Sequence, residues 1–222
     1  MLPVEYAGNE TLNETLEDIE REIKNCRKCE LWKTKTNYVP GEGNEKARVF
    51  LIGEAPGREE DRQGRPFVGN AGKLLNELLS SIGLSRKDVF IGNVLKCRPP
   101  NNRDPTPEEV EACSPYLVRQ LNVVRPDIIV CLGRHSSSFV FSLFELPFRG
   151  ITKERGNIRK VKAWGKDVYI IPVYHPAAAL YRPQLRDVLF EDFRKVGNVL
   201  RNLKGDGKNS SGNTTLSDYG FV

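Results

Sequence analysis

Four of the five cysteines in this 222-residue chain are spaced in a way that could hold one metal centre. Cys26 and Cys29 form a C-x2-C pair, whose two thiolates can reach the same metal. Cys97 and Cys113 are separated by fifteen residues, a spacing too wide for a zinc knuckle. Four thiolates without a histidine suit either a structural zinc ion or an iron–sulfur cluster, and the plain alternative is a set of unrelated buried thiols. Cys131 lies within an apolar run and is interpreted as a small core residue.

A second group of residues could bind a flat polar ligand. Phe67 is a single aromatic residue among small ones, and it follows a densely charged stretch. Asn93 interrupts an apolar run; its amide carries both a donor and an acceptor, so it could recognise one edge of a base or simply bond to the backbone. His175 is followed by proline and small residues, where either a functional or a structural imidazole would fit. His135 begins an expected helix and is interpreted as a surface or cap residue.

These residues must be positioned by regular elements, and the hydrophobic pattern predicts strands that alternate with helices. The expected strands are 49–52, 89–95, 127–132, 158–163 and 167–174, and the expected helices are 11–25, 71–82, 106–123, 134–144 and 184–203. Asn70 and Thr106 are the expected N-caps of two helices. The charged stretch is expected to be a solvated loop, and irregular structure is expected at 34–43, 145–157 and 175–183.

Alternating strands and helices are typical of an α/β fold with a mainly parallel sheet. In such sheets, ligands bind beyond the carboxyl ends of the strands. Glu54, Asn93 and His175 all lie at or just after the end of an expected strand, and Gly133 follows another. The pattern therefore predicts that these positions converge on a single site at one end of the sheet.

Length and composition restrict the class of protein. A chain of this length suits one domain or two small ones; we expect one domain over 1–203 and a disordered tail over 204–222, where Gly, Asn, Ser and Thr dominate. No apolar run approaches the ~20 residues needed to span a bilayer, and the sequence does not begin with a secretory signal, so we expect a cytoplasmic protein. In that compartment, cysteines favour metal or redox chemistry over disulfides. A net charge of +5 permits nucleic-acid binding without requiring it.

Taken together, these motifs resemble those of the family 4 uracil-DNA glycosylases, the iron–sulfur, thermophile-type enzymes. The resemblance covers roughly residues 20–200. It depends on the early C-x2-C pair, GEAPG at 53–57, EEDRQGRPFVG at 59–69, GNVLKCRPP at 92–100, Cys113 and HPAA at 175–178. It implies a three-layer α/β/α fold around a central, mainly parallel four-stranded sheet.

The resemblance also implies an activity and a cofactor. The activity is hydrolysis of the N-glycosidic bond of uracil in DNA, which leaves an abasic site for base excision repair, by a monofunctional and monomeric enzyme. The cofactor is a [4Fe–4S] cluster, and its ligands would be Cys26, Cys29, Cys97 and Cys113. Because these cysteines flank a proline-rich loop, the cluster is expected to hold loops rather than to transfer electrons.

The family resemblance assigns the base to a pocket. Phe67 would stack on the extruded uracil, and Asn93 would hydrogen-bond its N3–H and O4. Cytosine presents the opposite donor pattern at that edge and would leave the amide unpaired. Backbone groups of the 54–57 turn, at Ala55 and Gly57, would also hold the base.

The resemblance assigns further residues to selectivity and chemistry. Glu60 would crowd the 5-methyl group of thymine. A neutral His175 would donate a hydrogen bond to uracil O2, where negative charge develops as the base departs. Related glycosylases use an aspartate where this chain has Ala55, so Glu54 is the nearest carboxylate that could act as a base. Leu180 is the candidate wedge that fills the gap left by the flipped base.

Two other functions are compatible with the same residues. One is a non-catalytic nucleic-acid-binding module that keeps the cluster, and the other is a glycosylase for another deaminated base such as hypoxanthine. The four residues that argue against the first alternative are Glu54, Phe67, Asn93 and His175.

The C-terminal segment suggests a protein partner. Residues 213–221 loosely resemble a sliding-clamp-binding peptide, with Leu216, Tyr219 and Phe221 as its anchors. The segment departs from the usual pattern, because Asn stands for Gln and Gly precedes Phe.

Overall fold

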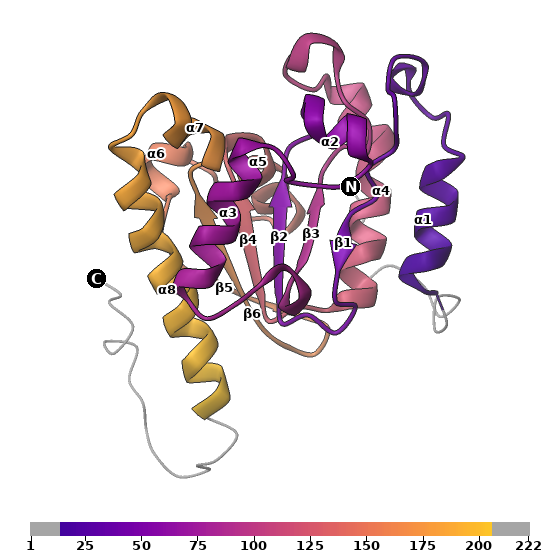
Figure 1. Cartoon of the computed structure of the whole chain (residues 1–222). Coiled ribbons are helices and arrows are strands. Elements are labelled where there is room, and N and C mark those ends of the chain that lie inside the picture. Colours follow the sequence, from indigo (N-terminus) through magenta and orange to yellow (C-terminus); the bar gives the residue numbers. More distant parts are fainter. Residues whose placement is uncertain (1–13, 206–222) are drawn as a thin grey trace.

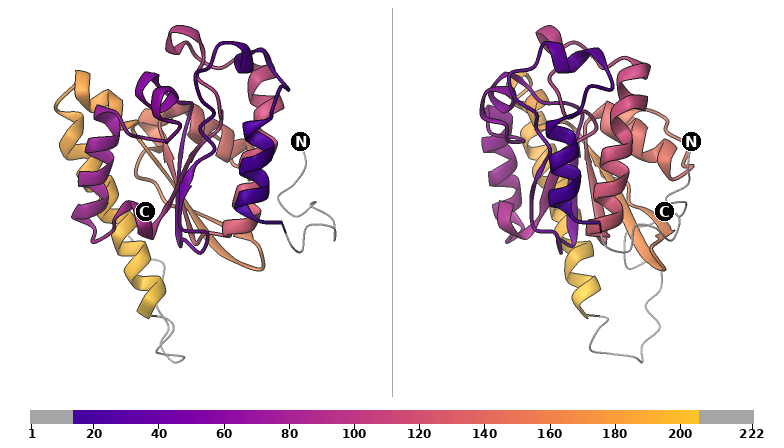
Figure 2. Two further views of the ribbon diagram at one scale, coloured as in Figure 1. Left: turned by 45° about the vertical axis from the view of Figure 1, so that its right-hand side comes forward. Right: turned by 90° about the vertical axis from the view of Figure 1, so that its right-hand side faces the viewer.

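The computed structural model describes residues 14–205, and in this range a mixed sheet lies between two layers of helices (Figures 1 and 2). The strands are β1 (Glu42–Gly43), β2 (Val49–Gly53), β3 (Phe90–Asn93), β4 (Ile128–Leu132), β5 (Arg159–Ala163) and β6 (Lys166–Val173). They form a six-stranded sheet in the order β1-β3-β2-β4-β6-β5. The four central strands β3, β2, β4 and β6 are parallel, whereas β1 and β5 pair antiparallel at the two edges.

The predicted three-layer α/β/α architecture is confirmed, and its parallel centre has four strands. Four strands was nevertheless the wrong number for the whole sheet, because an antiparallel strand extends each edge. β5 coincides with the strand predicted at 158–163. β1 lies in a segment expected to be irregular; two residues are too few to show any alternation, and they become a strand only by pairing with β3.

Helices cover both faces of the sheet. They are α1 (Leu16–Lys24), α2 (Arg58–Gln63), α3 (Asn70–Ser81), α4 (Pro107–Val124), α5 (Arg134–Leu143), α6 (Ile151–Glu154), α7 (Pro176–Tyr181) and α8 (Leu185–Gly205). Short 3-10 turns occur at Glu30–Lys33, Arg86–Asp88 and Pro100–Asn102. Helices α3 and α8 pack on one face and α4 and α5 on the other, with α1 alongside α4 (Figure 2).

The parallel strands are buried on both sides because their side chains alternate between two cores. In β2, Val49 and Leu51 pack against α3 and α8, whereas Phe50 and Ile52 pack against α4 and α5. All four side chains are at most 2% exposed, so the strand is apolar throughout instead of alternating with polar residues. This two-sided burial is why the continuous apolar runs of the sequence predicted the central strands correctly.

Of the two N-caps predicted from the sequence, the structure confirms one and contradicts the other. Thr106 caps α4 in a capping box with Glu109, as predicted. Asn70 does not cap α3; it is the first helical residue, and the N-cap is Gly69. The Gly69 N–H instead donates to the carboxylate of Glu60 at 3.0 Å, so a side chain from another helix satisfies this terminus.

Three segments expected to be irregular contain helical turns. The charged stretch is α2, whose acidic residues lie in its first turn, where the helix dipole favours them. One of these acids, Asp61, is buried and accepts hydrogen bonds from the N–H groups of Thr36 and Asn37, so this charge is structural, whereas the arginines of the stretch are exposed. α6 lies within 145–157 and α7 within 175–183, and both are too short to show helical periodicity.

Helix α8 extends to Gly205, two residues past its predicted end. The rest of the predicted tail and the clamp-like segment 213–221 lie outside the described residues. Within the described part of the chain, the helices lack the combination of length and apolar character needed to cross a bilayer.

Candidate active site

The carboxyl ends of the parallel strands meet at one end of the sheet, which is the upper end in Figure 1. In the β2–β3 register, Gly53 pairs with Asn93. The N–H of Gly133, just past β4, donates to the carbonyl of Val173 at the end of β6 (2.9 Å), and His175 follows two residues later. The sheet therefore brings together positions that lie up to 122 residues apart in sequence (53 to 175).

Phe67, in the loop between α2 and α3, lies against the end of β2. A Cβ at Gly53 would lie 2.2 Å from Asn93 Oδ1 and 2.8 Å from Phe67 Cε2, so only glycine lets the amide and the ring meet there. The Phe67 ring also stacks on the His175 imidazole, with centroids 5.5 Å apart and planes inclined by 27°. Gly53, Phe67, Asn93 and His175 thus form one group, which we call the strand-end pocket.

The amide of Asn93 is buried and incompletely bonded. The residue is 1% exposed, and within residues 14–205 its Oδ1 has no hydrogen-bond partner. Leaving a buried acceptor unpaired costs about 1–3 kcal/mol, so such an atom calls for an explanation, and a bound ligand would be one. The main-chain carbonyl of Asn93 accepts a hydrogen bond from Lys96 Nζ at 2.8 Å, which anchors the end of β3. The amide is therefore held in place with an acceptor available to a ligand.

His175 is a neutral hydrogen-bond donor in this structure. Its Nδ1 accepts a hydrogen bond from the N–H of Ala177 at 3.1 Å, so in the neutral ring Nε2 carries the proton. Burial lowers the pKa of His175 to about 4, although the charge of Glu60 acts in the opposite direction. At neutral pH the imidazole is therefore uncharged and presents Nε2–H.

Glu60 and the turn after β2 form another wall of the site. Glu60 Oε1 accepts hydrogen bonds from the N–H groups of Val68 (2.9 Å) and Gly69 (3.0 Å), and its Oε2 would lie 2.8 Å from a Cβ at Gly57. The carboxylate is therefore fixed between this turn and the loop that carries Phe67. Ala55 packs its methyl group toward the apolar cluster that contains Cys97 and Cys113, which leaves its backbone as the part that can face a ligand.

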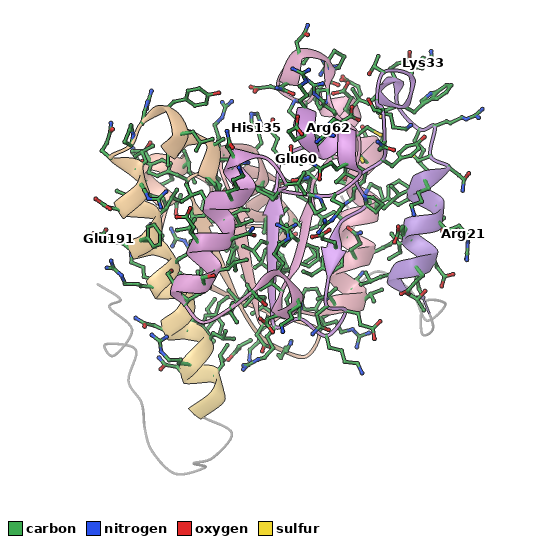
Figure 3. The ribbon with its side chains drawn as sticks, viewed as in Figure 1. Arg21, Lys33, Glu60, Arg62, His135 and Glu191 are labelled. Carbon is green, nitrogen blue, oxygen red and sulfur yellow. The ribbon has the colours of Figure 1, made fainter. Side chains whose placement is uncertain are left out.

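Glu54 lies beside His135, which in turn contacts Asp104. His135 Nε2 lies 3.8 Å from Glu54 Oε2 and 3.2 Å from Asp104 Oδ2, and Arg134 pairs with Asp104 at 3.0 Å. Burial raises the pKa of Glu54, and the charge of His135 partly offsets this. Figure 3 shows His135 and Glu60 at the same end of the sheet. His135 is the second residue of α5 and its side chain is 30% exposed, which is compatible with its interpretation as a surface residue; its position two residues after Gly133, at a strand end, is what brings it near Glu54.

Leu180 and Tyr181 lie at the end of α7, five and six residues after His175. Their exposed fractions are 47% and 86%, and within the described range they are the exposed large apolar side chains. Exposed apolar groups at the edge of a polar site indicate a contact surface rather than a core.

The four cysteines predicted as metal ligands line one small cavity. The cavity lies between α1, the turn after it, the segment after β3 and α4; we call it the cysteine cavity, lined by Cys26, Cys29, Cys97 and Cys113. Cys131 lies elsewhere, fully buried in β4 among the side chains that pack on α4 and α5, as predicted.

The donors of the cysteine cavity fit a thiolate-bound metal centre. Burial raises the pKa of Cys97, and mutual repulsion among the four sulfurs raises it further. Burial raises the pKa of Cys113 to about 11, although the main-chain N–H of Lys96 donates to its Sγ at 3.2 Å. Four neighbouring thiolates, of which those of Cys97 and Cys113 are buried, need a bound cationic centre to coexist, because the metal charge reverses these shifts. The donor set accommodates zinc or an iron–sulfur cluster.

Sequence comparisons identify the family. The model of the Uracil DNA glycosylase superfamily matches residues 40–201. A type-4 uracil-DNA glycosylase of Archaeoglobus fulgidus is 63% identical over 186 residues, which cover 84% of this chain and 94% of that protein. The chain belongs to the type-4 uracil-DNA glycosylases.

Other members of the type-4 family are also similar. The type-4 uracil-DNA glycosylase of Saccharolobus solfataricus is 54% identical over 188 residues, covering 84% of this chain and 87% of that protein. The type-4 uracil-DNA glycosylase of Sulfurisphaera tokodaii is 54% identical over 184 residues, which cover 82% of this chain and 84% of that protein. The resemblance inferred from the motifs is thereby confirmed.

Proposed function

We propose that this chain hydrolyses the N-glycosidic bond of uracil in DNA and leaves an abasic site. One observation carries the proposal: a buried amide with an unpaired oxygen lies beside an aromatic ring and a neutral imidazole, at the strand ends of a type-4 uracil-DNA glycosylase fold. A flat pyrimidine with an N–H and two carbonyl groups matches these donors and acceptors.

Recognition of the base is assigned to Asn93 and Phe67. The unpaired Oδ1 of Asn93 supports its role as acceptor for uracil N3–H, with the amide nitrogen donating to O4. Cytosine has an unprotonated N3 and an amino group at C4, so both contacts would fail at once, and rejection on this basis is typically severe. Phe67 supplies the stacking surface, and the 54–57 turn, at Ala55 and Gly57, supplies backbone contacts.

Glu60 is assigned to selectivity against thymine. Its carboxylate is held by two backbone N–H groups and lies against Gly57, so it cannot withdraw easily from the edge of the pocket. A rigid, hydrated carboxylate beside C5 of the base would oppose a methyl group there while tolerating hydrogen.

The chemistry is assigned to His175 and Glu54. Cleavage of the glycosidic bond leaves negative charge on uracil O2, and the Nε2–H of a neutral His175 stabilises that charge as it forms. The departing sugar becomes cation-like, and Glu54 is the carboxylate near it that can orient water and accept its proton. The raised pKa of Glu54 and its contact with His135 support this assignment, because a base works best with a pKa near the operating pH.

The base must leave the helix to reach this pocket, and Leu180 is assigned as the wedge. Its side chain is 47% exposed at the end of α7, close in sequence to His175. An exposed apolar group can occupy the gap in the base stack without disturbing the protein core.

We infer that the cysteine cavity holds a [4Fe–4S] cluster through Cys26, Cys29, Cys97 and Cys113. When bound, the cluster links α1, the segment after β3 and α4, and no step of the hydrolysis passes through it. The four converging sulfurs and the membership of this family support the assignment. Anaerobically purified protein should be brown with broad visible absorption; a colourless, zinc-loaded sample would exclude the cluster.

Oligonucleotides with one modified base test the function. The full chain is incubated with duplexes that contain uracil, hypoxanthine or only normal bases, and abasic sites are then cleaved with hot alkali. Strand breaks at uracil, with release of free uracil, are expected. No break at uracil would reject the assignment and favour the non-catalytic module, whereas breaks at hypoxanthine alone would favour the other deaminated base.

A second proposal concerns residues 213–221, which lie outside the described part of the chain. We propose that they bind a sliding clamp, on the strength of their likeness to clamp-binding peptides. A pull-down compares the full chain with a chain that lacks 210–222. Equal clamp retention by both would exclude this role.

A further inference from the structure

The backbone of Phe67 adopts a conformation that phenylalanine rarely takes. Its φ is +51°, in the left-handed region that favours glycine. Bulky residues persist there only when the surrounding structure holds them, and such positions cluster at functional sites. The direction of the Phe67 ring, which contacts the end of β2 and stacks on His175, follows from this backbone conformation.

One side chain hydrogen-bonds the backbone carbonyls of Pro66 and Phe67. Arg86, in the 3-10 turn between α3 and β3, donates from Nη1 to the carbonyl of Phe67 (3.0 Å) and from Nη2 to the carbonyl of Pro66 (2.6 Å). A longer contact joins Nη1 to Asn76 Oδ1 at 3.4 Å. The guanidinium thus spans two successive carbonyls, which fixes the orientation of the two peptide planes that meet at the Phe67 Cα.

Arg86 is itself fixed by Glu42 in β1. Glu42 Oε1 accepts hydrogen bonds from Arg86 Nε (2.9 Å) and Nη2 (2.6 Å), while Arg65 Nε donates to Oε2 (2.7 Å). Burial would raise the pKa of Glu42, but its bonds to Arg65 and Arg86 outweigh burial and hold the pKa below its usual range. The carboxylate is therefore ionised at neutral pH and keeps the guanidinium in position.

Helix α3 closes the other side of the same carbonyl. A Cβ at Gly72 would lie 1.8 Å from the Phe67 oxygen, so the helix approaches the loop as closely as glycine permits. The oxygen is enclosed between the Arg86 guanidinium and the first turn of α3, which leaves little room for the Phe67 peptide to rotate.

We propose that Arg86, held by Glu42, is a positioning residue for uracil recognition that acts by fixing the Phe67 ring in the pocket. The proposal rests on the proposed function, since it presumes that Phe67 stacks on the base. Arg86 does not need to touch the substrate, and it lies outside the motifs that carry the family resemblance. A lysine could keep the charge pair with Glu42, but a single ammonium cannot span two carbonyls and a carboxylate in one plane.

A double-mutant cycle tests this role with a matched control. Uracil excision is measured as kcat and KM for wild type, R86M, R86K, F67L and R86M/F67L, and R65M serves as control because Arg65 pairs with the same Glu42 without contacting the 66–67 carbonyls. We expect R86M to lower kcat/KM about tenfold to a hundredfold, since small misplacements at an active site have effects of that size. R86K should lose less, and R65M should stay within about twofold.

Coupling to Phe67 is the decisive result. If Arg86 acts through the ring, R86M should have almost no further effect in the F67L background. Full additivity of the two losses, or an equal loss in R65M, would overturn the proposal. If R86M does not fold, as judged by circular dichroism and cluster absorption, the same cycle with R86K decides. Absence of uracil excision by wild type would instead reject the proposed function.

Discussion

The strand-end pocket and the cysteine cavity are built in opposite ways, although Lys96 connects them. Lys96 donates from Nζ to the carbonyl of Asn93 and from its main-chain nitrogen to Cys113 Sγ. The pocket lies on the ends of paired strands, whose register and hydrogen bonds fix it. The cavity lies outside the sheet, where α1, two connecting segments and α4 meet.

This difference predicts how each region depends on ligands. The pocket is positioned by the core and can keep its shape without a base. The cavity brings together four sulfurs, and burial and repulsion by neighbouring sulfurs disfavour the thiolates of Cys97 and Cys113, so we predict that its closed form depends on a bound metal centre. Damage to the cavity should therefore appear mainly as lost stability, and damage to the pocket mainly as lost activity.

The largest expected effect on stability is that of Cys113→Ala. A centre that joins residues 26 to 113 closes a long loop, and by analogy with a covalent cross-link its loss should cost about 4 kcal/mol. Metal content and the melting temperature are measured against Cys131→Ala, a buried cysteine outside the cavity. Equal metal content and equal melting temperatures in the two variants would show that Cys113 does not hold a metal centre that stabilises the fold.

The largest expected effect on activity is that of His175→Leu, because leucine has no hydrogen-bond donor. Loss of the Nε2–H donor should lower kcat by about 10²- to 10³-fold, the effect of removing one oxyanion donor. The visible absorption should change little, because the cavity is untouched, and the melting temperature should fall only modestly, because helix α7 loses the acceptor for the Ala177 N–H. A variant that loses its metal together with its activity would show that the two regions are not separate.

Asn93→Leu should separate recognition from stability. Loss of the amide should lower kcat/KM for uracil by about 2 kcal/mol, or roughly thirtyfold, since base contacts are lost. The variant should nevertheless be as stable as wild type or slightly more stable, because a buried oxygen without a partner in residues 14–205 is removed. Kinetics and thermal unfolding are measured on the same samples; a large drop in melting temperature would mean that the amide has a structural role.

Leu180→Ala should have a smaller effect that depends on the substrate. Excision from duplex DNA should fall by roughly 1 kcal/mol, since the wedge no longer fills the stack, while excision from single strands should be unchanged. Stability should change by less than about 0.5 kcal/mol, as for other exposed substitutions. Tyr181→Ala is the neighbouring control. An equal loss on both substrates would argue against a wedge.

The smallest expected effect is the contribution of His175 protonation to the pH dependence of folding stability. Its pKa of about 4 lies below the usual 6.5, so the folded ring stays neutral as pH falls through 6.5, whereas the unfolded ring takes up a proton. This residue therefore makes the fold less stable as pH falls from about 6.5 to 4 and has no effect above that range. The chain has two histidines, so ring NMR signals of His135→Gln report His175 alone. A midpoint near 6.5 would show that the ring is not buried as described.

Much of the fold followed from local patterns. The central strands were predicted because both their faces are buried, which produces apolar runs, and α4 was predicted because Thr106 and Glu109 form a capping box. Short elements were missed, since two residues in β1 or six in α2 and α7 cannot show a period. The cap of α3 was missed because Glu60, from another helix, satisfies it.

In the site too, some residues could be predicted from local sequence patterns, whereas others depend on contacts with distant segments. Glycine, asparagine and histidine at strand ends pointed to the pocket because parallel strands deliver their carboxyl ends to one place. The contact of His135 with Asp104, 31 residues earlier (135 − 104), could not be predicted from spacing. The contact of Arg86 with Phe67, 19 residues earlier (86 − 67), could not be predicted either.

By itself, the sequence determined the layered fold, the C-x2-C pair and the glycosylase family, because these follow from residue type, order and spacing along the chain. Only the tertiary structure decided which nitrogen of His175 carries the proton, that Asn93 retains an unpaired oxygen, and that a guanidinium holds Phe67 in a left-handed conformation. The reason is physical: spacing fixes which strand ends meet, but hydrogen-bond partners and exclusion from water arise only when distant segments pack together.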